Sequence, residues 1–313
     1  MFSTKTSQPI YAIAGPTASG KTALGVAVAL LVGGEVINFD SVQIYREIEI
    51  ATAKPTADEM QGVPHHLIGY VDPRSDYTAA DWSRDAVLKI SEIESRGRIP
   101  VLVGGTGFYL RTLLNPLFES PKTDESIRQR LRSLKNDKGA EHLHKILKRL
   151  DPESATVFSP RDYVRVIRAI EVFLQTGNRI SDRRAERPPP PEFASRVRTF
   201  VLNPPRDKVY DLIDRRTEKH FANGLVDEVI RLRNSGLADS SNALGSHGYR
   251  RVCEYLRAER TLKSAVELTK QDIRNYSKRQ ITWFRSEVGV SWLERFGTDG
   301  YLANEIAGVG RAK

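Results

Sequence analysis

The stretch AGPTASGKT, at residues 14–22, constrains the fold most strongly. It places Gly15, Gly20, Lys21 and Thr22 at the spacing G-x-x-x-x-G-K-[ST]. The apolar run PIYAIAG precedes it with the character of a buried strand, and TALGVAVALL follows with the length and composition of a helix. A strand, a glycine-bearing turn and a helix in this order predict a phosphate-binding loop. The motif does not show what the phosphates are attached to.

Each part of the loop has an expected role. Glycines let the backbone N–H groups turn toward the phosphates, the helix N-terminus adds its positive end, and Lys21 adds a full charge. The Thr22 hydroxyl would reach a phosphate-bound Mg²⁺, which is the expected cofactor. The predicted phosphate-binding residues are Gly15, Pro16, Thr17, Ala18, Ser19, Gly20, Lys21 and Thr22.

Alternating strands and helices in the first third of the chain predict a doubly wound α/β fold. EVINFDS and IPVLVGGTG read as two further strands, with a helix at residues 78–97 between them. Strands separated by helices form a parallel sheet, whose ligands bind at the carboxyl ends of the strands. Asp40, Ser41 and residues 104–107 are therefore expected to face the phosphate loop.

From residue 115 the pattern becomes purely helical, until RRAERPPPPEF breaks it and VRTFVLN returns to strand character. The predicted fold is thus a parallel sheet of the P-loop NTPase type, flanked by helices, with an inserted all-helical domain. We assign residues 1–114 and 196–313 to the catalytic core and residues 115–195 to the insertion.

The net charge of +9 is unevenly distributed. Residues 1–114 carry 10 basic and 12 acidic side chains, residues 115–195 carry 16 and 12, and residues 196–313 carry 22 and 15. A basic excess beyond the phosphate loop favours a nucleic-acid partner, although a merely basic surface would have the same composition. No apolar stretch is long enough to span a membrane and no secretory signal is visible, so we expect a cytoplasmic protein without a membrane partner.

Two chemistries are open from the residues alone. The loop could serve an ATP-dependent kinase of small molecules, with arginines on a lid. Alternatively, a diphosphate could be the leaving group, with Asp40 as the base for an acceptor amine. Asp40 could equally cap a helix or hold Mg²⁺ through water. An arginine stripe at 161, 165 and 168 is, by itself, typical of a solvated surface.

Several longer motifs carry a family resemblance. Within residues 9–290 the chain contains, in this order, the motifs AGPTASGKT, NFDSVQIY, ATAKPT, VPHHLIG, YTAADW, GGTGFYL, RVIRAIEV and SKRQITWFR. Together they resemble the tRNA dimethylallyltransferase family. The resemblance implies transfer of the dimethylallyl group of dimethylallyl diphosphate to the exocyclic amine of the adenosine beside the tRNA anticodon. It also implies that the phosphate loop holds this diphosphate rather than ATP.

The resemblance also implies residue roles. Asp40 would be the general base, and Thr17 and Arg216 would act on the diphosphate; the choice of Arg216 over Arg215 rests on one short helix. The tRNA anticodon stem-loop would be contacted by Asp40, Ser41, Val42, Gln43, Thr106, Arg128, Val164, Arg165, Val166, Ile167, Arg168, Gly245, Ser246, His247, Gly248, Tyr249, Arg250, Lys278, Arg279, Gln280, Ile281, Thr282, Trp283, Phe284 and Arg285.

The chain departs from the family pattern at His247, where an apolar residue is usual, and its segment after about residue 292 resembles nothing specific.

An enzyme that prenylates free AMP remains an alternative that needs no basic insertion, and the small-molecule kinase would account for the loop alone. A tRNA-binding protein without catalysis is disfavoured because Lys21, Thr22 and Asp40 are all present. We expect a monomer.

Overall fold

A computed structural model of the chain describes residues 8–184 and 186–308. The described residues form two compact units: one runs to Leu114 and resumes at Pro191, and the other is Asn115–Pro190. The helical segment that the sequence assigns to an insertion thus lies between two parts of one larger unit. No helix in the described ranges is both long and apolar enough to cross a membrane.

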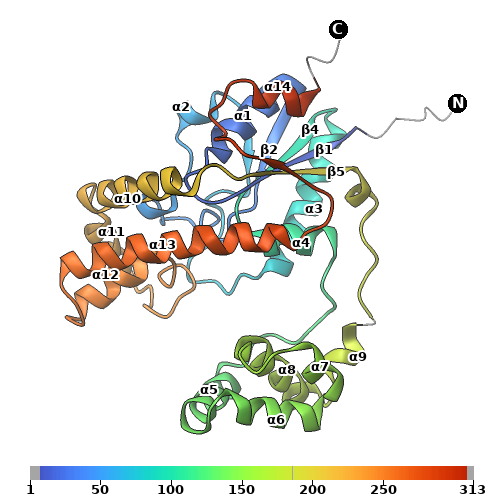
Figure 1. The fold of residues 1–313 in the computed structure, drawn as a ribbon, viewed down its shortest axis with the longest axis vertical. Coiled ribbons are helices and arrows are strands. Elements are labelled where there is room, and N and C mark those ends of the chain that lie inside the picture. The colour runs from blue at the N-terminus through green and yellow to red at the C-terminus, as the bar shows by residue number, and fades with distance from the viewer. Residues whose placement is uncertain (1–7, 185, 309–313) are drawn as a thin grey trace, which may run out of the picture. The chain divides into compact units, whose positions relative to one another are not determined.

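The larger unit is built on a parallel sheet, as predicted (Figure 1). Six strands of the described residues lie in the order β3-β2-β4-β1-β5-β6, and every neighbouring pair is parallel. The central strand β1 aligns Ile13 with Val103 of β4 on one side and with Phe200 of β5 on the other. The strands are β1 (Ile10–Ala14), β2 (Gly34–Asn38), β3 (His65–His66), β4 (Ile99–Val103), β5 (Val197–Leu202) and β6 (Val290–Leu293).

Alternation along β1 gives the sheet two packed faces. Tyr11 and Ile13 face one apolar cluster, which includes Leu24 of helix α1. Ile10 and Ala12 face the other cluster, which includes residues of helix α3. Because successive side chains of a strand point to opposite faces, a fully apolar strand needs helices on both sides. The helices of this first half are α1 (Lys21–Val32), α2 (Ala57–Met60), α3 (Ala79–Ser95) and α4 (Gly107–Leu114), with a 3-10 turn at Ile50–Thr52.

Local signals in the sequence explain where the helices begin and end. Thr78 and Asp81 form a capping box at the start of α3. Gly224, with φ 90°, precedes α11 and separates it from α10. The second half of the unit contains a 3-10 turn at Glu192–Arg196 and the helices α10 (Arg206–Ala222), α11 (Leu225–Asn234), α12 (Tyr249–Leu256), α13 (Leu262–Arg285) and α14 (Leu302–Ala307).

The smaller unit is entirely helical in its described part, which confirms the predicted helical insertion. Its apolar core includes Leu143 and Leu147 of α6 and Ile170 of α8. Glu171 is also buried there, and its Oε2 accepts hydrogen bonds from Arg128 Nε at 3.0 Å and Arg168 Nη1 at 2.9 Å. The helices are α5 (Glu125–Lys138), α6 (Ala140–Leu150), α7 (Pro152–Val157), α8 (Tyr163–Thr176) and α9 (Ile180–Arg184).

Candidate active site

The phosphate loop, residues 15–22, joins β1 to α1 at the carboxyl edge of the sheet. Gly15 and Gly20 have φ of 142° and 86°, and Ala18 has φ of 62°. A Cβ added at Gly15 would lie 2.9 Å from the carbonyl oxygen of Leu202 on β5, so this position leaves room only for glycine. No described side chain caps the N-terminus of α1. The first N–H groups of this helix therefore remain available to an anion.

Two cationic side chains converge on the loop. The Lys21 Nζ donates to the Pro16 carbonyl oxygen at 2.6 Å, and Arg216 Nη2 of α10 donates to Thr17 Oγ1. Burial lowers the pKa of Lys21 to about 8; Asp40 opposes this shift and Arg216 reinforces it. Burial also lowers the pKa of Arg216, against the attraction of Asp40. Cations that have lost hydration in this way gain from an anionic ligand between them.

The structure separates the two adjacent arginines of α10. Arg216 is partly buried and lines the same cavity as Lys21. Arg215 is exposed, and its Nε donates to the Asp211 carbonyl oxygen at 3.3 Å within the same helix. This placement supports the choice of Arg216 as the diphosphate contact.

Asp40 lies directly beyond β2, at the edge of the sheet where the phosphate loop lies. Its Oδ1 accepts hydrogen bonds from the N–H groups of Val42 at 2.9 Å and Gln43 at 3.3 Å. Asn38 Oδ1 in turn accepts from the Asp40 N–H at 3.2 Å. The second carboxylate oxygen makes no hydrogen bond to the described residues, so it can accept a proton from a bound molecule.

These groups share one cavity of about 1170 Å³ in the larger unit. Lys21, Asp40 and Arg216 all line it. The hydroxyl of Ser19 is buried in this loop and makes no hydrogen bond within the described part of the chain. It is therefore available to hydrogen-bond a ligand. Segments distant in sequence add Gly245, Ser246, His247, Tyr276, Gln280 and Thr298 to the wall.

The wall of this cavity is partly aromatic. The rings of His247 and Tyr276 lie 4.9 Å apart between centroids, with planes tilted by 50°. Burial and, after it, the nearby charge of Arg279 lower the pKa of His247 to about 4. His247 is therefore neutral at pH 7 and presents an uncharged ring to the cavity.

The predicted RNA contacts on α13 and before α12 fall into two groups. The side chains of Lys278, Arg279 and Thr282 are exposed, whereas those of Tyr249 and Phe284 are fully buried in the core. Because Tyr249 and Phe284 are 0% exposed, neither their side chains nor their backbones present surface to RNA in this structure, contrary to the prediction. Since no bound RNA is described, the other contacts remain predictions.

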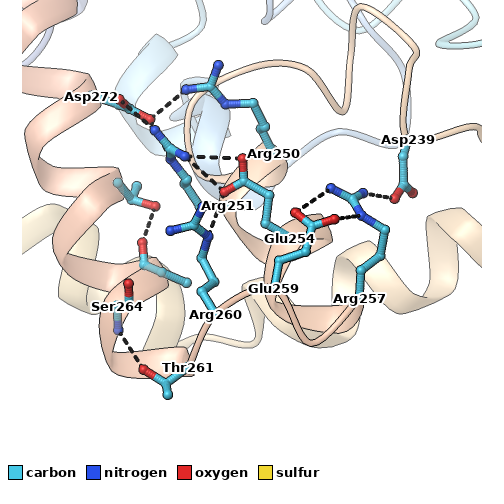
Figure 2. Close-up of polar contacts among 12 residues, drawn as sticks. Asp239, Arg250, Arg251, Glu254, Arg257, Glu259, Arg260, Thr261, Ser264 and Asp272 are labelled. Atoms are coloured by element: carbon cyan, nitrogen blue, oxygen red, sulfur yellow. Dashed lines mark hydrogen bonds and ion pairs between the residues drawn. The ribbon is translucent and has the colours of Figure 1, made fainter.

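Figure 2 shows the ion pairs that join α12 to α13. Arg250 Nη2 and Arg251 Nε both donate to Asp272 Oδ2 at 2.8 Å, and Arg251 Nη1 donates to Glu254 Oε2 at 2.9 Å. The Arg250 side chain keeps 47% of its surface exposed. The network therefore holds the start of α12 against α13 while leaving Arg250 accessible.

In the smaller unit, the predicted RNA contacts on α8 also divide by exposure. Val164 is 66% exposed, and the Arg165 side chain is 64% exposed. Val166 and Ile167 belong to the unit's core. The side chains of Arg128 and Arg168 pair with the buried Glu171 and are less exposed than that of Arg165. Arg165 is therefore the most accessible cation among the predicted contacts of this unit.

A segment that the sequence did not connect to the site packs on the phosphate loop. After β6, the N–H of Gly297 donates to the Ser19 carbonyl oxygen at 2.8 Å. Phe296 and Ala18 both pack against the apolar cluster of Val209, Ile213 and Ile273, and Thr298 lines the cavity. No local motif marks these residues, because their contact with the loop arises only when β6 pairs with β5.

Comparison with known proteins agrees with this geometry. The family model "IPP transferase" matches residues 43–287. A tRNA dimethylallyltransferase of Geobacter sulfurreducens is 43% identical over 285 residues, which is 90% of each chain, and one of Myxococcus xanthus is 44% identical over 282 residues, 90% of this chain and 91% of its own. The crystal structure of a tRNA isopentenylpyrophosphate transferase from Bacillus halodurans is 37% identical with a TM-score of 0.70 and 97% of both chains covered. A eukaryotic dimethylallyltransferase, described as acting on tRNA, is 27% identical with a TM-score of 0.77, covering 96% of this chain and 77% of its own.

Proposed function

The chain belongs to the IPP transferase family, and we propose that it transfers a dimethylallyl group from dimethylallyl diphosphate to an adenosine amine of tRNA, releasing diphosphate. Like the relatives that it resembles, it is a tRNA-modifying prenyltransferase. The observation that carries the proposal for the site is the meeting of Lys21, Arg216 and Asp40 in one cavity. The reaction requires positive charge beside the leaving diphosphate and a carboxylate base beside the attacking amine.

At the leaving-group end, negative charge develops on the diphosphate as its bond to the dimethylallyl carbon breaks. Lys21 and Arg216 lie where they can stabilise this charge, together with the free N–H groups of α1. The side chain of Thr17 orients Arg216 by accepting its hydrogen bond. Because these groups are fixed by the fold before the substrate arrives, little reorganisation is needed in the transition state.

At the acceptor end, the exocyclic amine must lose a proton as it attacks the carbon. Asp40 is a carboxylate on the cavity wall with one oxygen that accepts no hydrogen bond from the described residues, and its other oxygen fixes its orientation through Val42 and Gln43. An adenosine in the anticodon loop would have to turn out of its stack to reach this carboxylate. We propose that His247 and Tyr276 offer the flipped base an aromatic wall.

Magnesium is the proposed cofactor. The Thr22 hydroxyl lines the cavity beside Lys21, and the described residues contain no cluster of three His, Cys, Asp or Glu side chains that could hold a metal. An ion held mostly by phosphate oxygens and water, with Thr22 as its protein ligand, suits this donor set. When bound, it would supply further positive charge to the diphosphate.

We further propose that the enzyme works as a monomer in the cytoplasm on the anticodon stem-loop of tRNA. Lys21, Asp40 and Arg216 all lie on one chain, so the proposed chemistry requires no residue of a second copy. The net charge of +9 supports an RNA partner.

The decisive experiment offers labelled dimethylallyl diphosphate and Mg²⁺ with an unmodified anticodon stem-loop RNA, with the same RNA carrying inosine at the target position, or with AMP. We expect label on the first RNA alone, because inosine lacks the exocyclic amine. Label on AMP would move the chain to the adenylate prenyltransferases. Phosphate transfer from ATP to a small acceptor, with no prenyl transfer, would contradict the proposal.

A further inference from the structure

The carboxamide of Gln280 is occupied at both ends inside the protein. Gln280 lies on α13 and is 4% exposed. Its Oε1 accepts a hydrogen bond from the Thr17 N–H of the phosphate loop at 2.9 Å, and its Nε2 donates to the Gly105 carbonyl oxygen at 3.0 Å. The side chain thus bridges the phosphate loop and the loop after β4.

Thr17 is consequently held from two helices. Gln280 of α13 binds its backbone N–H, and Arg216 of α10 binds its side-chain hydroxyl. The next residue, Ala18, has φ of 62°, a conformation that costs a non-glycine residue energy and persists only when its surroundings impose it. Gln280 fixes the peptide group between Pro16 and Thr17, and it thereby supplies part of the constraint on the turn that contains Ala18.

The Gln280 carboxamide occupies space that is open because residue 105 is a glycine. A Cβ added at Gly105 would lie 2.1 Å from Gln280 Nε2 and 3.3 Å from the Gly15 carbonyl oxygen. Any side chain at position 105 would therefore displace the carboxamide. Glycine at this position keeps the route from α13 to the phosphate loop open.

We infer that Gln280 is a positioning residue that holds the phosphate loop in its diphosphate-binding shape, and that its side chain does not read the RNA. The inference rests on the proposed function, because it takes residues 15–22 to be the diphosphate site. A loop whose backbone N–H groups must converge on a phosphate loses affinity when one peptide plane turns. Gln280 acts on the diphosphate through Thr17, whose backbone N–H donates to its carboxamide oxygen.

The test replaces Gln280 with Met, which keeps the length of the side chain and removes both hydrogen bonds. Gln271→Met is the matched control, because Gln271 is an exposed glutamine on the same helix. Lys278→Met tests an exposed cation two residues before Gln280. Three quantities are measured for each variant: the Kd for inorganic pyrophosphate with Mg²⁺, the Kd for anticodon stem-loop RNA at fixed salt, and the midpoint of thermal unfolding.

We expect Gln280→Met to weaken pyrophosphate binding by roughly tenfold or more, the effect of about one lost hydrogen bond, while RNA affinity changes less than twofold. Lys278→Met should show the reverse pattern, and Gln271→Met should change neither affinity. Should Gln280→Met fail to fold, Gly105→Ala displaces the carboxamide without removing it and should weaken pyrophosphate in the same way.

Two outcomes would overturn the inference. Loss of RNA affinity with unchanged pyrophosphate affinity would make Gln280 an RNA contact. Unchanged affinities for both ligands would show that the bridge does not shape the loop. If the unsubstituted enzyme binds no pyrophosphate at all, the proposed diphosphate site fails instead, so the two failures are distinguishable.

Discussion

At the scale of single residues, Asp40 separates catalysis from binding. We expect Asp40→Asn to lower the turnover number by at least about a hundredfold, because the amide cannot accept the proton of the attacking amine. The amide oxygen can still accept the hydrogen bonds from Val42 and Gln43, so the turn after β2 should persist. Single-turnover prenylation and RNA binding, measured on the same preparation, check both statements. Normal turnover by this variant would remove Asp40 from the role of base.

Lys21 gives diphosphate binding a specific pH dependence. In the free protein, burial lowers its pKa to about 8. A bound diphosphate raises that pKa again, so above pH 8 the complex holds a proton that the free protein lacks. The ionisation of Lys21 should therefore leave the affinity for pyrophosphate independent of pH below pH 8 and lower it by up to about tenfold per pH unit above pH 8.

The comparison that isolates this effect is with Lys21→Met. Pyrophosphate has ionisations of its own, but they act equally on both proteins. The ratio of the two affinities should stay constant below pH 8 and shrink above it. A ratio that stays constant up to pH 10 would show that Lys21 remains charged in the free enzyme.

At the scale of elements, the segment after β6 supports the phosphate loop from outside. A Cβ added at Gly297 would lie 2.3 Å from the Gly20 carbonyl oxygen, whereas one added at Gly300 would meet nothing within 4 Å. We expect Gly297→Ala to weaken pyrophosphate binding by roughly tenfold, since overpacking typically costs 1–3 kcal/mol, and Gly300→Ala to leave it unchanged. Calorimetric titration of both variants checks this. Equal affinities would show that the loop tolerates displacement of this segment.

The sequence predicts the central elements well because their signals are local. Residues 10–14 and 99–103 are apolar runs of strand length, and the helix at 79–95 begins at a capping box. The edge strands β3 and β6 were not predicted. Two and four residues long, with side chains that are mostly half-buried or exposed, they have no periodicity of their own and exist because β2 and β5 offer them an edge.

In the site, too, some contacts can be predicted from local sequence and others cannot. The phosphate loop is readable because its residues are contiguous, and Asp40 because it ends a predicted strand. The hydrogen bond between Gln280 and Thr17 joins residues separated by 263 positions. The sequence around either residue does not indicate this contact with the other. The contact of Gly297 with the loop is equally non-local. Such contacts follow from the packed fold, which local sequence patterns do not encode.

At the scale of the whole molecule, the basic charge should dominate RNA affinity. Release of counterions from about six RNA phosphates would make the affinity fall by roughly 300- to 2,000-fold between 50 and 200 mM salt. Arg165→Met should reduce the slope of log Kd against log salt by about one contact. Arg84→Met is the matched control, because Arg84 is equally exposed and also pairs with an aspartate three residues before it. Equal slopes for all three proteins would exclude Arg165 from the RNA interface.

The contact between Gly297 and Ser19 also sets an order in time. Residues 15–22 leave the ribosome well before the strand β5 beside them and the segment that covers them. A nascent chain therefore carries the loop sequence for a time without the neighbours that shape it. We therefore expect the phosphate loop to reach its diphosphate-binding shape only after residue 298 has emerged.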